Sequence, residues 1–140
     1  MEQRKYRILK RSSYLAIKVF GKSQEELFGN SAYALFDLMT DMDNVQVQER
    51  LPLEVEGVDR DDLMVNWMRE LLYLYQGSGY LLKEFRFDDV KDDRVRGEVA
   101  GEKFDPDRHE IMREIGSVAY HQSRMERTGD QWTAQVIFEL

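Results

Sequence analysis

The residues best suited to chemistry stand at the end of the chain. The last segment alternates so that Trp132, Val136 and Phe138 share one face, which places Glu139 on the opposite, polar face. The Glu139 side chain therefore stands one residue from the terminal carboxylate of Leu140. Paired carboxylate oxygens suit a hard cation such as calcium, which takes about six to eight oxygen ligands. Glu139 and Leu140 form a metal site if the fold adds further oxygens; otherwise they form a solvated chain end.

The usual catalytic motifs are missing, so we expect no catalytic residue. The sequence has no Gly-rich phosphate loop, no nucleophile elbow, no His-Glu-x-x-His and no Cys. Its two histidines do not stand at metal-ligand spacing. We expect His121 to be a hydrogen-bonded strand residue and His109 to anchor the loop 104–109. The stretch 41–44 has two carboxylates but lacks the Gly and distal Glu of a calcium loop, which indicates a plain polar turn.

The balance of charge limits the possible partners. The formal net charge is −7, and because phosphate backbones are bound chiefly by clustered Lys and Arg, we expect no direct tight binding of nucleic acid. A local exception is a basic cluster near the start of the chain, formed by Arg4, Lys5, Arg7, Lys10 and Arg11. This cluster is either a solvated, charge-balancing strand or a binding patch.

Length and composition predict a single folded domain over residues 1–140. The 140 residues are 42% hydrophobic and 34% charged, which is ordinary for a globular protein. No apolar run is long enough to span a bilayer, and the first ten residues lack the apolar core of a signal peptide. We therefore expect a cytoplasmic protein without membrane contact, and composition leaves the oligomeric state open.

The segment 61–75 is predicted to be the central helix. Its apolar residues recur in two neighbouring rows, one containing Trp67 and Leu71, so most of its circumference should be covered. Asp59 provides a start signal and Gly77 a stop signal. We expect Trp67 and Leu71 to belong to the core.

A second helix and several strands complete the predicted fold. Ser23 and Glu26 form a capping box at the start of a helix that extends to about Thr40. Strand-like alternation marks 15–20, with 6–8 in the same strand or leading into it, and then 45–55, 81–90, 94–104, 115–127 and 131–140. This order predicts an α+β fold, with two helices packed on antiparallel β-sheet.

Short blocks along nearly the whole chain also stand in the order and at the spacing of a known family. They are Gly21-Lys22-Ser23 with Glu25-Glu26-Leu27-Phe28, Ala34-Leu35-Phe36, Leu38-Met39-Thr40-Asp41, Trp67 with Glu70-Leu71-Leu72-Tyr73-Leu74, Gly101-Glu102-Lys103-Phe104-Asp105-Pro106 with Arg108-His109, Tyr120-His121, and Val136-Ile137-Phe138-Glu139-Leu140. In these blocks the chain resembles the archease family.

The resemblance implies a small α+β protein that is not itself an enzyme. Members of the family assist a GTP-dependent RNA ligase of the tRNA-splicing type, promoting guanylylation of the ligase and repeated turnover in RNA end joining. The implied partner is such a ligase, and the implied cofactor is calcium or another divalent cation. In the family the cation is held by the last Asp of an Asp-His-Thr-Ala-Asp stretch and by an Asp beside the C-terminus, with the terminal residue contributing. The C-terminal positions imply Glu139 and Leu140 here.

The chain departs from the family at this metal motif. The Asp-His-Thr-Ala-Asp stretch falls on residues 10–14, so Tyr14 replaces the metal-binding Asp and Lys10 and Arg11 replace Asp and His. Gly116 stands at or near the place of a family Lys. We expect Lys10 or Arg11 to take the place of calcium by pairing with the carboxylates at the chain end, with the Tyr14 hydroxyl nearby. The alternative is that these side chains point to water.

Three functions remain open at this level. The first is an archease-like accessory protein of an RNA ligase. The second is a diverged protein-binding module that has lost metal binding and ligase activation. The third, a metal-dependent hydrolase, is the weakest, because one clear acidic side chain cannot assemble an activating metal site.

Overall fold

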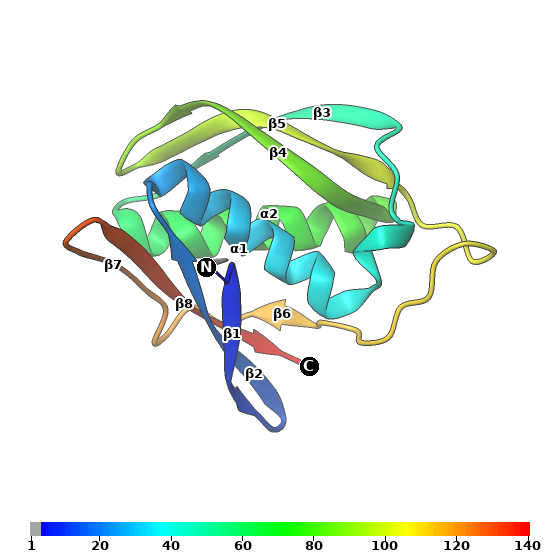
Figure 1. The fold of residues 1–140 in the computed structure, drawn as a ribbon, viewed down its shortest axis with the longest axis horizontal. Helices are drawn as coiled ribbons and strands as arrows, with labels where there is room; N and C mark the ends of the chain where they lie inside the picture. Colours follow the sequence, from blue (N-terminus) through cyan, green and yellow to red (C-terminus); the bar gives the residue numbers. More distant parts are fainter. Residues whose placement is uncertain (1–3) are drawn as a thin grey trace.

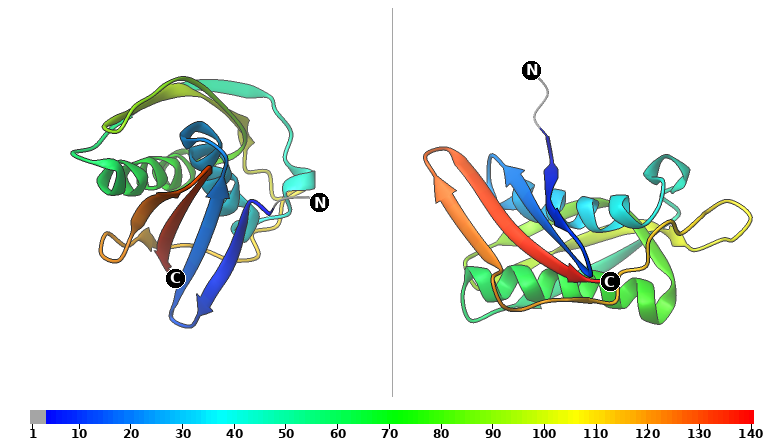
Figure 2. Two further views of the ribbon diagram at one scale, coloured as in Figure 1. Left: turned by 60° about the vertical axis from the view of Figure 1, so that its left-hand side comes forward. Right: turned by 90° about the horizontal axis from the view of Figure 1, so that it is seen from below.

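The computed structural model describes residues 4–140, which fold into two helices held between two antiparallel sheets (Figures 1 and 2). The helices are α1 (Gln24–Met39) and α2 (Arg60–Ser78), with a short 3₁₀ helix η1 (Met42–Asn44). The strands are β1 (Tyr6–Arg11), β2 (Tyr14–Gly21), β3 (Glu49–Glu56), β4 (Tyr80–Val90), β5 (Arg94–Lys103), β6 (Ser117–Val118), β7 (Arg124–Thr128) and β8 (Gln131–Glu139). The predicted α+β class, with two helices packed on antiparallel sheet, is confirmed.

The two sheets differ in the number and order of their strands. The three-stranded sheet has the order β3-β5-β4, and Pro52 lies on its edge strand β3, as a residue that cannot donate to a ladder should. The five-stranded sheet has the order β1-β2-β8-β6, with β7 also paired to β8. Its central strand β8 is therefore flanked by β2 on one side and by β6 and β7 on the other.

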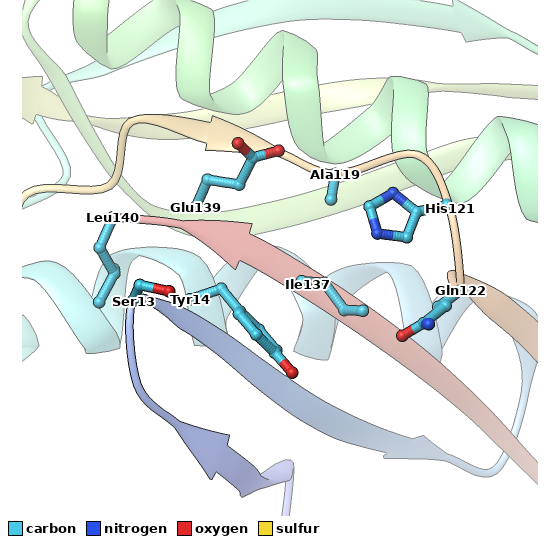
Figure 3. Close-up of a pocket in the computed structure, with 8 residues that line it drawn as sticks. All are labelled: Ser13, Tyr14, Ala119, His121, Gln122, Ile137, Glu139 and Leu140. Carbon is cyan, nitrogen blue, oxygen red and sulfur yellow. The ribbon is translucent and has the colours of Figure 1, made fainter.

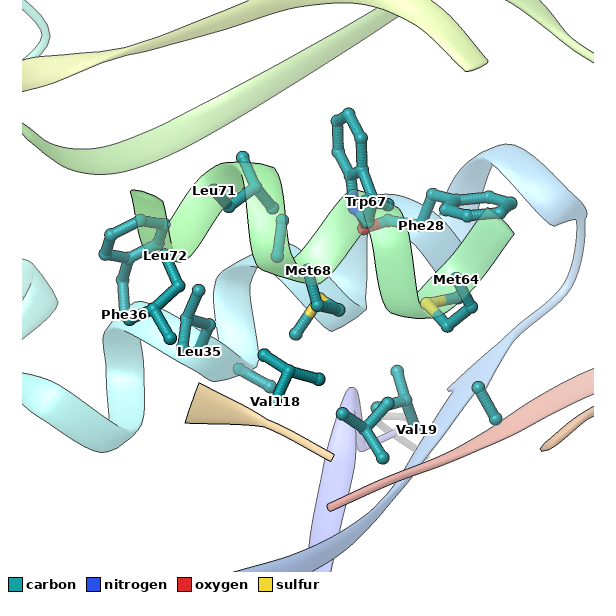
Figure 4. Close-up of a cluster of buried hydrophobic side chains, with 14 of the residues drawn as sticks. Val19, Phe28, Leu35, Phe36, Met64, Trp67, Met68, Leu71, Leu72 and Val118 are labelled. Atoms are coloured by element: carbon teal, nitrogen blue, oxygen red, sulfur yellow. Dashed lines mark hydrogen bonds between the residues drawn. The ribbon is translucent and has the colours of Figure 1, made fainter. Parts of the chain in front are cut away.

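The core surrounds α2, which packs on both sheets. Trp67 and Leu71 are 2% and 0% exposed, so the prediction that both are core residues is confirmed. Trp67 points toward the three-stranded sheet and packs against Phe87 of β4, while Met68 points toward Val118 of the other sheet (Figure 4). The Trp67 indole N–H donates to the carbonyl of Phe28 at 3.0 Å, which satisfies the one polar atom of this buried ring.

The helix ends show where local signals act. Ser23 caps α1 by accepting from the amide of Glu26 at 3.1 Å, as predicted, although the Glu26 carboxylate accepts from Lys22 rather than from Ser23. Asp59 caps α2 as predicted. The predicted stop at Gly77 was wrong, because α2 continues to Ser78 and ends at Gly79, whose φ of +76° is left-handed.

Three predicted strands were wrong in extent. Residues 6–8 belong to a separate strand, β1, which forms a hairpin with β2 around Ser12 and Ser13. The segment 45–55 becomes a strand only from Glu49 onward. The segment 115–127 is divided into β6 and β7 by a turn in which Gln122 has a φ of +65°.

A buried polar cluster fixes the loop after β5 against η1. The Glu102 carboxylate accepts two hydrogen bonds from Arg108, one from the Gln46 amide and one from His109. The His109 Nδ1 accepts from the amide of Asp105 at 2.9 Å, so the ring proton sits on Nε2, which lies 3.1 Å from Glu102. His109 thus anchors its loop, as predicted. Burial opposes ionisation of Glu102, but these donors prevail and hold its pKa below the usual range.

The stretch 41–44 is the polar turn that the sequence predicts, wound as the 3₁₀ helix η1. Asp41 caps it by accepting from the amide of Asp43 at 3.0 Å. Neither helix in the described part of the chain combines the length and apolar composition needed to cross a membrane.

We expect Leu71→Ala to lower the free energy of unfolding by about 2 to 5 kcal/mol, because it removes a fully buried side chain from α2 and leaves a cavity. Urea denaturation measures the loss. Tyr73→Ala is the matched control, since Tyr73 lies on the same helix and is 67% exposed. Equal stability of the Leu71→Ala and wild-type proteins would refute the burial.

We also expect the stability of the protein to fall as the pH drops through the lowered pKa of Glu102. A carboxylate whose pKa is depressed by folding contributes stability above its unfolded pKa of about 4.3 and loses it on acidification. Glu102→Gln should cost about 1 to 3 kcal/mol at pH 7 and flatten the acid limb of the stability profile. Glu84→Gln, at an exposed ion pair, is the control. Parallel acid limbs for wild type and Glu102→Gln would contradict this account.

Candidate functional site

The start of β2 and the end of β8 meet at one end of the five-stranded sheet. Tyr14 pairs directly with Glu139, and Glu139 pairs with Ser117 on its other side. Two backbone bonds join the surrounding segments, from the Gly116 amide to the Glu139 carbonyl at 2.8 Å and from the Leu140 amide to the Ser13 carbonyl at 3.4 Å. The structure thus brings Ser13 and Tyr14, the last two residues of the altered stretch, to the chain end.

A hollow of about 490 Å³ opens at this junction (Figure 3). Its walls combine polar and apolar groups from the β1–β2 turn, β8 and the turn before β7: Ser13, Tyr14, Ala119, His121, Gln122, Ile137, Glu139 and Leu140. Ile137 and Ala119 are buried with Ala16 in a small cluster against which Tyr14 packs. The hollow therefore has an apolar floor and a rim that carries the carboxylate of Glu139.

The expected ion pair between the basic residues and the chain end does not form. Within residues 4–140 no ion pair joins Lys10 or Arg11 to Glu139 or to the terminal carboxylate. The reason is the strand order, because β2 lies between β1 and β8. The Lys10 ammonium instead lies 5.3 Å from the centre of the Tyr14 ring.

Tyr14 does not take the expected position either. Its ring extends away from the Glu139 carboxylate (Figure 3), and among the described residues its hydroxyl forms no hydrogen bond with Glu139. The pairing of the two backbones therefore does not join the two side chains.

His121 was wrongly placed in a strand. It lies in the turn between β6 and β7, where it is exposed and lines the same hollow as Glu139 and Leu140. The turn at Gln122 contains no Gly or Pro, so the sequence pattern did not indicate a turn and His121 was missed as a site residue. The one signal that could have identified His121 was its place in the Tyr120-His121 block.

The comparisons with known proteins agree with this architecture. The model of the Archease protein family matches residues 6–140. The protein archease of Methanopyrus kandleri is 35% identical over 128 residues, which cover 89% of this chain and 91% of that protein. The protein archease of Pyrococcus furiosus is 34% identical over 130 residues, which cover 90% and 92%. The chain belongs to the archease family.

Two solved structures share the archease fold. The solution structure of protein 1598 of Methanobacterium thermoautotrophicum has a TM-score of 0.83 and 27% identity, and the match covers 97% of this chain and 99% of that one. The crystal structure of an archease from Thermotoga maritima, described as a possible chaperone, has a TM-score of 0.63 and 16% identity, with 100% and 98% covered, and shows the fold alone.

The site of this archease does not fit the metal that the family resemblance implies. Among residues 4–140 no group of three or more His, Asp or Glu side chains is close enough together to hold an ion. Position 14, which pairs with Glu139 in the strand register, carries a phenol in place of a carboxylate. Glu139 and the terminal carboxylate of Leu140 supply too few oxygens for calcium.

We expect the wild-type protein to show no micromolar calcium binding in isothermal titration calorimetry. Tyr14→Asp should bind calcium at least about tenfold more tightly than Tyr14→Asn, because a carboxylate at position 14 faces Glu139 across the strands. The Asn variant matches the change in size without the charge. Micromolar binding to wild type that is abolished by Glu139→Ala would show that the unaltered residues suffice.

Proposed function

We propose that this archease is an accessory protein of a GTP-dependent RNA ligase of the tRNA-splicing type, acting in the cytoplasm. It promotes guanylylation of the ligase and its turnover and is not itself an enzyme. The observation that carries the proposal is the family match over residues 6–140, on a fold whose chain-end segments meet at a surface hollow. The described residues supply no nucleophile and base in contact there.

The hollow is suited to contact with a partner surface. Glu139, Leu140 and His121 are exposed on its rim and come from two segments, the end of β8 and the turn after β6, whose strands are joined by backbone pairing. Such a rigid rim can dock on a folded protein without the ordering cost of a flexible loop. We propose that this contact promotes guanylylation and turnover of the ligase without a bound metal.

A second candidate function is a protein-binding module that has lost ligase activation. Tyr14 in the position of the family Asp favours it, because the replacement removes a charge from the middle of the site. In this case the same hollow binds a different protein. The Thermotoga relative is described as a possible chaperone, and an accessory role in assisting another protein is of the same general kind.

We expect addition of the protein to raise the guanylylated fraction of the ligase and the number of ligations per ligase molecule. The assay joins 3′-phosphate or cyclic-phosphate RNA ends to 5′-hydroxyl ends, using the RNA ligase of the same organism, under multiple-turnover conditions. His121→Ala combined with Glu139→Ala should reduce the stimulation by about tenfold or more, and a calcium chelator should leave it unchanged.

Arg96→Gln, an exposed change on the other sheet, is the control and should stimulate fully. No stimulation, together with failure to co-purify with the ligase, would exclude the ligase role and leave the binding module. Stimulation that the chelator abolishes would exclude the metal-independent contact.

A further inference from the structure

The charge of the chain is divided sharply between one hairpin and the rest. Residues 4–22 contain seven Lys and Arg and no Asp or Glu. Since the whole chain has a net charge of −7, the other residues carry a net −14. The seven cations belong to β1, β2 and their flanks: Arg4, Lys5, Arg7, Lys10, Arg11, Lys18 and Lys22.

Strand register places three of these cations on one open face. Leu15, Ile17 and Val19 are fully buried toward the helices, so Ala16 and Lys18 point outward. Arg7 pairs with Lys18 and therefore shares this outer face.

Lys10 joins the same face because of a β-bulge. The register shifts between Ile8 and Lys10, so Lys10 pairs with outward-pointing Ala16 rather than with buried Leu15. Without the bulge Lys10 would face the core, and Leu9 would take its place outside. The bulge thus directs the Lys10 side chain to the outer face, and redirecting a side chain is a common role of β-bulges.

Two aromatic rings stand beside the cations on this face. Tyr14 and Phe20 occupy the same outer face of β2, with the Lys10 ammonium 5.3 Å from the Tyr14 ring centre and the Lys18 ammonium 5.9 Å from that of Phe20. We call Arg7, Lys10, Tyr14, Lys18 and Phe20 the basic face. The row continues across β8 and β7, where Lys18 pairs with Gln135 and Gln135 with Arg124.

The basic face is open, and its charge is not neutralised within the described chain. No ion pair joins Arg7, Lys10 or Lys18 to a carboxylate among residues 4–140. Both helices lie on the other side of this sheet, and the closed end of the hairpin projects from the body (Figures 1 and 2). The three cations are therefore free to meet an anionic partner, although the carboxylates of Glu139 and Leu140 border the Tyr14 end of the face.

We propose that the basic face binds single-stranded RNA, with phosphates on Arg7, Lys10 and Lys18 and bases against Tyr14 and Phe20. Clustered cations bind a phosphate backbone, and aromatic side chains stack on bases of any sequence. Alternate residues along a β-strand are about 6.6 Å apart. An extended RNA strand that lies along the basic face can therefore contact several of its cations and rings. The rings favour a nucleotide chain over an acidic polypeptide, whose carboxylates gain nothing from an aromatic surface.

The acidic remainder of the protein limits this binding to weak affinity. A net −14 outside the hairpin repels a long polyanion, and at physiological salt this repulsion is screened beyond about 8 Å. RNA therefore binds at the hairpin and is kept from the other surfaces. The inference is independent of the ligase role, because its test needs only this protein and RNA.

The test is fluorescence anisotropy with a 5′-labelled oligouridylate of about 20 nucleotides, in a series of salt concentrations. Wild type should bind with a dissociation constant of roughly 1 to 100 micromolar at low salt and no tighter than micromolar at physiological salt. Arg7→Gln combined with Lys18→Gln should weaken binding at least about tenfold. It should also lower the slope of log affinity against log salt by about 1.4, since each phosphate contact contributes about 0.7.

The matched control is Arg96→Gln combined with Lys103→Gln, which removes two exposed cations of the three-stranded sheet. It should leave affinity and slope unchanged. Tyr14→Leu should weaken binding several-fold without changing the slope, because stacking releases no counterions. Thermal melts check that each variant is folded.

Three results would overturn the proposal. The control variant, Arg96→Gln with Lys103→Gln, could weaken binding as much as Arg7→Gln with Lys18→Gln. That result would mean that RNA is attracted to cations anywhere on the surface and not to the basic face. Poly-L-glutamate of equal charge could compete as well as the RNA, which would identify an acidic polypeptide as the ligand. Wild type could fail to bind RNA even at low salt.

Discussion

The fold depends on one constraint, which is that α2 must be covered from two opposite sides. Trp67 packs toward the three-stranded sheet and Met68 toward the five-stranded sheet, so α2 is apolar on both faces and keeps only a narrow polar stripe. Because the helices fill the space between the sheets, the outer face of each sheet is left open to solvent. The chain-end hollow and the basic face both lie on this open side of the five-stranded sheet.

The sequence predicted well those features that follow from periodicity within one segment. The two helices, the long strands β4, β5 and β8, and the core positions of Trp67 and Leu71 belong to this group. It failed where a contact distant in sequence decides the outcome. The choice of Gly79 over Gly77 as the end of α2, and the division of 115–127 after two strand residues, are set by packing and not by local composition.

The site was predictable in its location and not in its contacts. The resemblance implied that residues 10–14 approach the chain end, and the pairing of Tyr14 with Glu139 agrees. The expected ion pair failed because β2 separates Lys10 from Glu139, a fact of strand order that no spacing in the sequence reveals. The bulge at Leu9 and the buried partners of Glu102 were equally hidden, since each depends on a residue in another segment.

The central place of β8 has a consequence for synthesis of the protein. Gly21 pairs with Trp132, about 110 residues later in the chain, so the inner edge of β2 has no native partner until nearly all of the sequence has left the ribosome. During that interval a largely apolar strand presents unpaired amides and carbonyls, which favour pairing with other chains. The cations of the hairpin repel a second copy of the same segment and so act as gatekeepers of the nascent chain. A feature suited to binding in the finished molecule thus also protects the unfinished one.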